Sequence, residues 1–137
     1  MLGATLGTLR GRVTGQRVLP STGSAARTEI SFEISGTLLG VKVTMLGTYW
    51  SVARAGGALY GECPNQGVLM SSSGPPATWT GAGMGRLTGK GSAVSFRGAI
   101  YVDGGGPKLT RLTRMAIVYE WDVAADGSAE ARFMEWR

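Results

Sequence analysis

The chain has 137 residues, a net charge of +5, a single cysteine and no histidine. This length favours one domain over residues 1–137, and an apolar content of 43% with a mean hydropathy of +0.06 indicates a folded chain rather than a disordered one. One cysteine excludes an intrachain disulfide, and the absence of histidine removes the commonest metal ligand and the commonest general base. We therefore expect no metal and no cofactor, and any chemistry must use carboxylates, tyrosines, arginine or shape.

No apolar run is long enough to span a bilayer, and the first residues lack the basic start and apolar stretch of a signal peptide. We expect a cytoplasmic location and no membrane partner. The cations are dispersed rather than clustered, which makes nucleic acid an unlikely partner despite the positive net charge.

Apolar and polar residues alternate with a period of two along most of the chain, and glycine- or proline-rich turns separate the alternating segments. Proline inside 63–67 predicts a break or bulge in its strand, and no segment shows sustained helical periodicity. The segments that we predict to be β-structure are 5–19, 27–35, 41–53, 58–70, the hairpin 78–102, 108–123 and 129–137.

Within the hairpin, Trp79 shares one strand face with Gly81, Gly83 and Gly85. Glycines repeated on one face predict tight curvature or space kept open beside an aromatic side chain. Together with the short connections, this favours an all-β fold, an antiparallel up-and-down β-barrel of about eight strands with a central cavity.

Three ionisable residues stand out because their sequence neighbours are apolar or glycine: Glu62, Arg97 and Glu120. A charged group that faces a core needs a partner, so an inward-pointing Arg97 would be held by Glu62 or Glu120. We take these three as the candidate catalytic residues, with solvent exposure on the outer face as the alternative.

Aromatic residues form the second group of candidates, because several of them around one cavity would line an apolar ligand pocket. Core packing is the alternative for each one. The predicted substrate-binding residues are Tyr49, Trp50, Tyr60, Trp79, Tyr101 and Tyr119.

The layout of these strands resembles the small eight-stranded barrels related to allene oxide cyclase. The resemblance is carried by segments spread over most of the chain: Glu29-Ile30-Ser31-Phe32, Tyr60-Gly61-Glu62, Trp79-Thr80-Gly81, Arg97-Gly98-Ala99 and Glu135-Trp136. No catalytic motif of that group matches residue by residue, so the resemblance is one of fold. It implies a cofactor-free barrel that folds a reactive apolar substrate into a productive shape.

Four functions follow from these observations. The first is a cofactor-independent cyclase or isomerase that orients a small, largely apolar substrate, such as one of a bacterial natural-product pathway. The second is a non-catalytic, lipocalin-like carrier that uses the same pocket. The third is a nucleic-acid-binding barrel, which the strand count disfavours. The fourth is a structural role in a homo-oligomer of two or more chains, because strands such as 115–123 are apolar on both faces, with Val118 and Met134 as candidate contacts.

Overall fold

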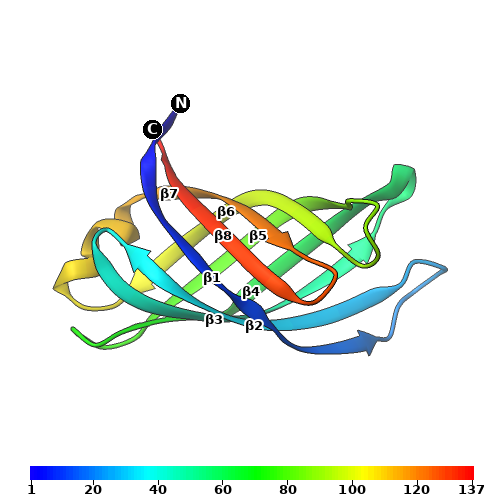
Figure 1. Cartoon of the computed structure of the whole chain (residues 1–137), viewed down its shortest axis with the longest axis horizontal. Coiled ribbons are helices and arrows are strands. Elements are labelled where there is room, and N and C mark those ends of the chain that lie inside the picture. The colour runs from blue at the N-terminus through cyan, green and yellow to red at the C-terminus, as the bar shows by residue number, and fades with distance from the viewer.

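Eight antiparallel strands follow one another around a closed barrel in chain order, and β8 pairs with β1 to complete it, as the computed structural model of residues 1–137 shows (Figure 1). This confirms the predicted fold class. The strands are β1 (Leu2–Leu19), β2 (Arg27–Leu38), β3 (Val41–Ala53), β4 (Ala58–Ser71), β5 (Ala77–Leu87), β6 (Val94–Gly104), β7 (Ala116–Val123) and β8 (Ser128–Trp136).

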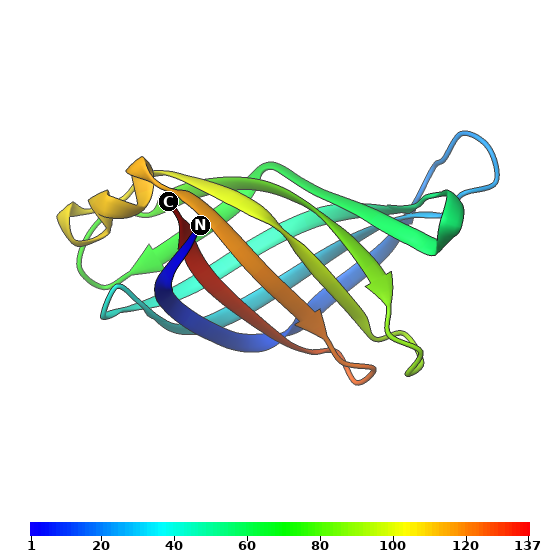
Figure 2. The same cartoon turned by 90° about the horizontal axis from the view of Figure 1, so that it is seen from above.

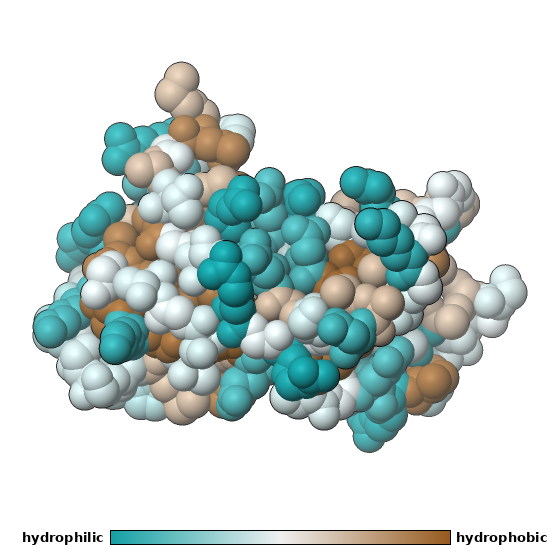
Figure 3. Space-filling view, in the orientation of Figure 1, coloured by the Kyte–Doolittle hydropathy of each residue, from teal (hydrophilic) through white to brown (hydrophobic).

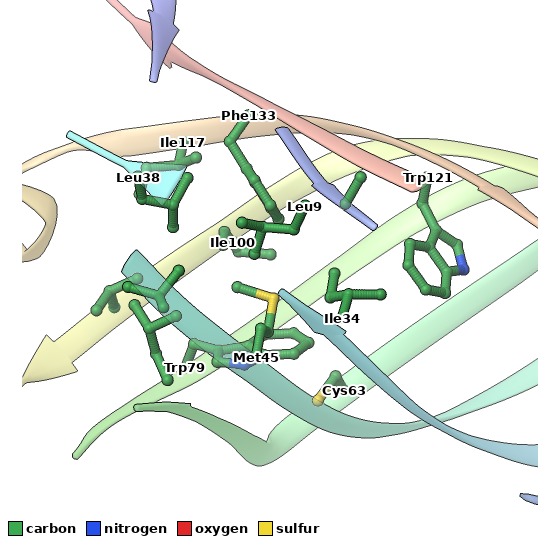
Figure 4. Close-up of a cluster of buried hydrophobic side chains, with 14 of the residues drawn as sticks. Leu9, Ile34, Leu38, Met45, Cys63, Trp79, Ile100, Ile117, Trp121 and Phe133 are labelled. Carbon is green, nitrogen blue, oxygen red and sulfur yellow. The ribbon is translucent and has the colours of Figure 1, made fainter. Parts of the chain in front are cut away.

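The hydrophobic core fills the barrel interior, because alternate residues of every strand point inward. In β7, for example, Ile117, Trp121 and Val123 are buried while Asp122 is exposed. Figure 4 shows side chains from opposite walls meeting in this core, with Met45 beside Trp79.

A short 3₁₀ helix closes one end of the barrel. Residues 108–114, predicted as the start of a strand, belong to η2 (Pro107–Arg114), and this prediction was wrong. Leu109 and Leu112 are three residues apart, which places them on one face of a helix with three residues per turn. Each is only 1% exposed and joins the barrel core.

The opposite end of the barrel carries the β1–β2 loop, η1 (Ala55–Gly57) and the β5–β6 and β7–β8 turns (Figure 2). No helix of the structure is long and apolar enough to cross a membrane. The predicted interruption of β4 is a bulge: the strand continues, but its register with both neighbours shifts near Cys63 and Gly67.

Charged side chains pair with one another on the outside of the barrel. Arg10 forms an ion pair with Glu130 at 2.8 Å between β1 and β8, and Arg132 pairs with Glu120 at 3.0 Å between β8 and β7. Figure 3 shows hydrophilic side chains gathered over the middle of this face. These pairs lie in solvent, where each contributes at most about 1 kcal/mol, so the interior rather than the surface stabilises the fold.

Candidate ligand-binding site

A cavity of about 450 Å³ occupies the end of the barrel opposite η2. This volume lies within the range of small-molecule sites. Its walls are mostly apolar, with a few neutral polar side chains and one carboxylate, that of Asp126. The lining residues are Val13, Gln16, Ala26, Thr28, Ile30, Tyr49, Ser51, Ala53, Leu59, Leu87, Ser92, Val94, Phe96, Val123, Ala124, Ala125, Asp126 and Gly127. We call this space the outer cavity.

A second, much smaller cavity of about 50 Å³ lies deeper in the barrel, and we call it the inner cavity. Tyr49 and Phe96 line both cavities and therefore form the boundary between them. The inner cavity has room for a few non-hydrogen atoms only, since one water molecule occupies about 30 Å³ of the liquid. A bound molecule would therefore place its body in the outer cavity and at most a small group in the inner one.

An aromatic cluster surrounds the boundary. The Phe32 ring lies 4.5 Å from that of Trp121 and 6.1 Å from those of Tyr49 and Trp79, and the Tyr49 ring meets Phe96 edge-on at 5.9 Å. Tilted and edge-on arrangements at these distances are favourable for aromatic rings. The cluster packs as a rigid unit at the base of the outer cavity.

Glycines in nearby strands make room for these rings. A Cβ atom on Gly67 would lie closer than 3.0 Å to the Trp79 indole, and one on Gly83 would collide with the Tyr119 hydroxyl. Of the repeated glycines, Gly83 and Gly85 leave space beside the aromatic side chains of Tyr119 and Phe96, as predicted, whereas Gly81 lies against Ile100. Where the wall lacks side chains, aromatic groups of nearby strands occupy the space.

Two tyrosine hydroxyls and two indole nitrogens are the main polar groups of the deep site. Trp121 Nε1 donates a hydrogen bond to Tyr49 Oη at 3.2 Å, whereas Tyr119 Oη and the buried Trp79 Nε1 have no partner in the protein. Burial raises the pKa of Tyr49 and of Tyr119 above the ordinary value of 10.0, so both phenols stay protonated at neutral pH. The site therefore offers neutral hydrogen-bond donors.

Arg97 lies on the outer face of β6 with its side chain 52% exposed, so the expectation that it points into the barrel was wrong. It does pair with Glu120, as expected, at 3.7 Å, and with Asp122 at 3.2 Å, but both contacts lie outside. The apolar neighbours of Arg97 in the sequence were misleading because successive residues of a strand point to opposite faces. Its neighbour Phe96 is the inward-pointing residue.

Glu62 borders the inner cavity, but its carboxylate accepts a hydrogen bond from the Tyr60 hydroxyl at 3.1 Å on the outer face. Gly61 and Cys63, the neighbours of Glu62, are the buried positions of this strand. The structure thus brings Arg97 and Glu120 together and leaves Glu62 apart, and it places all three carboxylate or guanidinium groups away from the interior. Nor are any three Cys, Asp or Glu side chains grouped closely enough to hold a metal ion.

The six predicted substrate-binding aromatics divide equally between the two faces. Tyr49, Trp79 and Tyr119 line the cavities. The other three lie outside: the rings of Trp50 and Tyr60 meet edge-on with their centres 5.5 Å apart, and Tyr101 is 54% exposed. Arg27 lies 4.4 Å from the centre of the Trp50 ring and Arg54 lies 4.4 Å from that of Tyr60, which marks these residues as a surface cation–π cluster.

Several lining residues were missed, most importantly Phe96, Trp121 and Ser51. For two of them the sequence does carry a signal. Trp121 is two residues from Tyr119, and Phe96 shares its strand face with Ile100, so the same period of two that identified the strands also places these rings inside. Ser51 carries no such signal, because an isolated serine is common on either face.

No protein-family model matches this chain, and no curated protein matches it. Two solved structures are similar to it in fold. The conserved protein of unknown function RPA1785 from Rhodopseudomonas palustris has a TM-score of 0.79 and 14% sequence identity, over 98% of this chain and 97% of its own. A protein of unknown function from Clostridium acetobutylicum ATCC 824 has a TM-score of 0.74 and 13% identity, over 97% of each chain. At this identity the likeness shows the eight-stranded antiparallel barrel alone, and no named relative links the chain to the allene oxide cyclase group.

Proposed function

We propose that the protein binds a small, largely apolar molecule in the outer cavity. The observation that carries this proposal is a 450 Å³ space at one end of a barrel whose other end is filled by Leu109 and Leu112 of η2. An eight-stranded barrel is just wide enough for its own side chains or for one small ligand. Here the short side chains of Ala26, Ala53 and Ser51 leave the ligand-sized space at one end.

A neutral fluorescent probe, N-phenyl-1-naphthylamine, tests this proposal. Its emission should rise on binding to the wild-type protein. Ser51→Phe places a ring inside the outer cavity and should weaken binding by tenfold or more, about 1.4 kcal/mol or more of binding free energy. Val52→Phe is the matched control, because Val52 is the next residue of β3 and points to the outer face. Equal affinity of the wild type and Ser51→Phe would contradict the proposal.

A second function, cofactor-independent cyclisation or isomerisation of the bound molecule, is favoured by the two protonated tyrosine hydroxyls at the inner cavity. A hydroxyl that donates to a carbonyl oxygen polarises it, and a confining apolar wall holds a flexible chain in a folded shape. Citronellal, which cyclises to isopulegol without any co-reactant, is a suitable probe. We expect faster cyclisation than in buffer and loss of the acceleration in Tyr49→Phe. If citronellal cyclises no faster with the wild type than in buffer alone, the function is restricted to binding.

Self-association stays a prediction. Val118 and Met134 are paired neighbours of β7 and β8, half-exposed on the outer face, with the exposed Trp136 close by on β8. Analytical ultracentrifugation of the wild type and of Val118→Glu checks it, because a charge at an apolar contact between copies should shift the protein to the monomer. A wild-type monomer at micromolar concentration would contradict it.

A further inference from the structure

The two cavities have no positively charged lining. The protein carries fourteen lysines and arginines, yet none of them lines either cavity. A ligand carboxylate or phosphate inside the barrel would therefore be buried without a counter-ion, which is strongly unfavourable. The lysine and arginine side chains that give the net charge of +5 therefore lie outside the two cavities.

A cationic ligand group is no better accommodated. The charged lining residues are Asp126 and Glu62. Asp126 is an exposed residue of the β7–β8 turn whose carboxylate accepts hydrogen bonds from the backbone and hydroxyl of Ser128 at 2.9 and 2.7 Å. The Glu62 carboxylate is engaged by Tyr60 outside the barrel. The buried part of the ligand is therefore neutral.

Tyr49 is the polar group best placed to meet such a ligand, because it lines both cavities. Its oxygen accepts the hydrogen bond from Trp121 Nε1, and its own hydrogen has no acceptor in the protein. A hydroxyl that accepts one hydrogen bond becomes a stronger donor in the next, so Trp121 favours donation by Tyr49. The unused hydrogen is therefore available to an acceptor atom of the ligand.

Trp121 holds the Tyr49 hydroxyl in place. The indole is buried, packs 4.5 Å from Phe32 and stands at 89° to the Tyr49 ring. Phe96 meets Tyr49 edge-on from another strand. Both the ring and the hydroxyl of Tyr49 are thus oriented before any ligand enters.

We propose that the ligand is a neutral, largely apolar molecule with a carbonyl-type oxygen, that this oxygen accepts a hydrogen bond from Tyr49 Oη, and that Trp121 is the positioning residue for that hydroxyl. This proposal rests on the proposed binding function and adds the chemical class of the ligand. It separates ketones, quinones and lactones, which fit, from fatty acids and amines, whose charged groups the interior does not compensate.

Three naphthalenes of similar size test the ligand class: 2-acetylnaphthalene with a carbonyl, 2-isopropenylnaphthalene with a methylene group in its place, and 2-naphthoate with a carboxylate. Their affinities are measured by calorimetry. We expect the ketone to bind about tenfold more tightly than the hydrocarbon, as a single desolvated hydrogen bond allows, and the carboxylate to bind most weakly. Equal binding of ketone and hydrocarbon would overturn the ligand class but leave the binding function intact. Binding of none of the three would overturn both.

Tyr49→Phe tests the anchor, because it keeps the ring and removes the hydroxyl. It should abolish the preference for the ketone over the hydrocarbon, whatever small change it makes in the affinity for both. Tyr101→Phe is the matched control, since it makes the same chemical change at an exposed site. A ketone preference that survives in a folded Tyr49→Phe would overturn the role of Tyr49. Should this variant fail to fold, the wild-type comparison of ketone and hydrocarbon still tests the ligand class.

Trp121→Phe tests the positioning role. The infrared carbonyl band of bound 2-acetylnaphthalene should lie at lower wavenumber in the wild type than in apolar solvent, and Trp121→Phe should move it part of the way back. A purely structural role for Trp121 would weaken the ketone and the hydrocarbon alike and leave the band where it is, which would overturn this part of the proposal.

Discussion

Replacement of Gly67 by alanine should destabilise the barrel by roughly 3 kcal/mol, the upper end of the usual range for overpacking a core. The new Cβ atom would fall closer than 3.0 Å to three atoms of the Trp79 indole, where ordinary contacts lie at 3.4–4 Å. Moving the ring would disturb its packing, because it also lies against Gly47 and Phe32 and Trp79 is only 6% exposed. The free energy of unfolding is measured by urea titration followed by circular dichroism.

The Trp79→Leu background provides the decisive comparison, because the smaller side chain leaves room for the methyl group. We expect Gly67→Ala to cost less than about 1 kcal/mol in that background, which makes the two substitutions strongly non-additive. Gly15→Ala is a control, since a Cβ atom there meets nothing within 4 Å, and it should change stability by no more than about 0.5 kcal/mol. An equal cost of Gly67→Ala with and without the Trp79 ring would refute the packing argument.

Three further predictions follow from the burial of individual groups. Arg97→Met should change the free energy of unfolding by less than about 0.5 kcal/mol, because its ion pairs with Glu120 and Asp122 lie in solvent; a loss above about 2 kcal/mol by urea titration would contradict its outward position. Cys63 should react with a disulfide reagent much more slowly in the folded protein than in urea, because its thiol is buried and burial raises its pKa; equal rates would show that the thiol is accessible. Burial raises the pKa of Tyr119 in the folded state, so its contribution to stability is complete below the ordinary value of 10.0 and is lost as the pH rises above it. The wild type should therefore lose more stability than Tyr119→Phe between about pH 9 and about pH 11. Equal losses would contradict this.

The strands and the barrel could be predicted from the sequence because both depend on local patterns. The period of two, the turn glycines and the proline of the β4 bulge act within a few residues of the chain. The match between glycines and rings also followed from strand periodicity, since Gly81, Gly83 and Gly85 share one face. These features hold for any barrel that contains such strands.

The face of each strand that points inward was harder to predict, because several strands carry apolar residues on both faces. In β6, Phe96 and Ile100 alternate with Ala99 and Tyr101, and the alternation alone does not say which set is buried. Barrel closure decides this through contacts with distant strands, and so it also decides the position of Arg97. The cavity lies at one end of the barrel because η2 fills the other end. The η2 segment was not predicted as a helix, because it is too short to show helical periodicity in the sequence.

The seam between β1 and β8 has a consequence for the synthesis of the protein. Every other strand pairs with its neighbour across a short connection, but β1 finds its second partner only in Ser128–Trp136. Contacts between segments so distant in the chain are slow to form, and an unpaired strand edge readily pairs with another molecule. A nascent chain that has released β1 to β7 therefore exposes two open edges, and strand exchange between neighbouring nascent chains is most favourable during the interval before β8 leaves the ribosome.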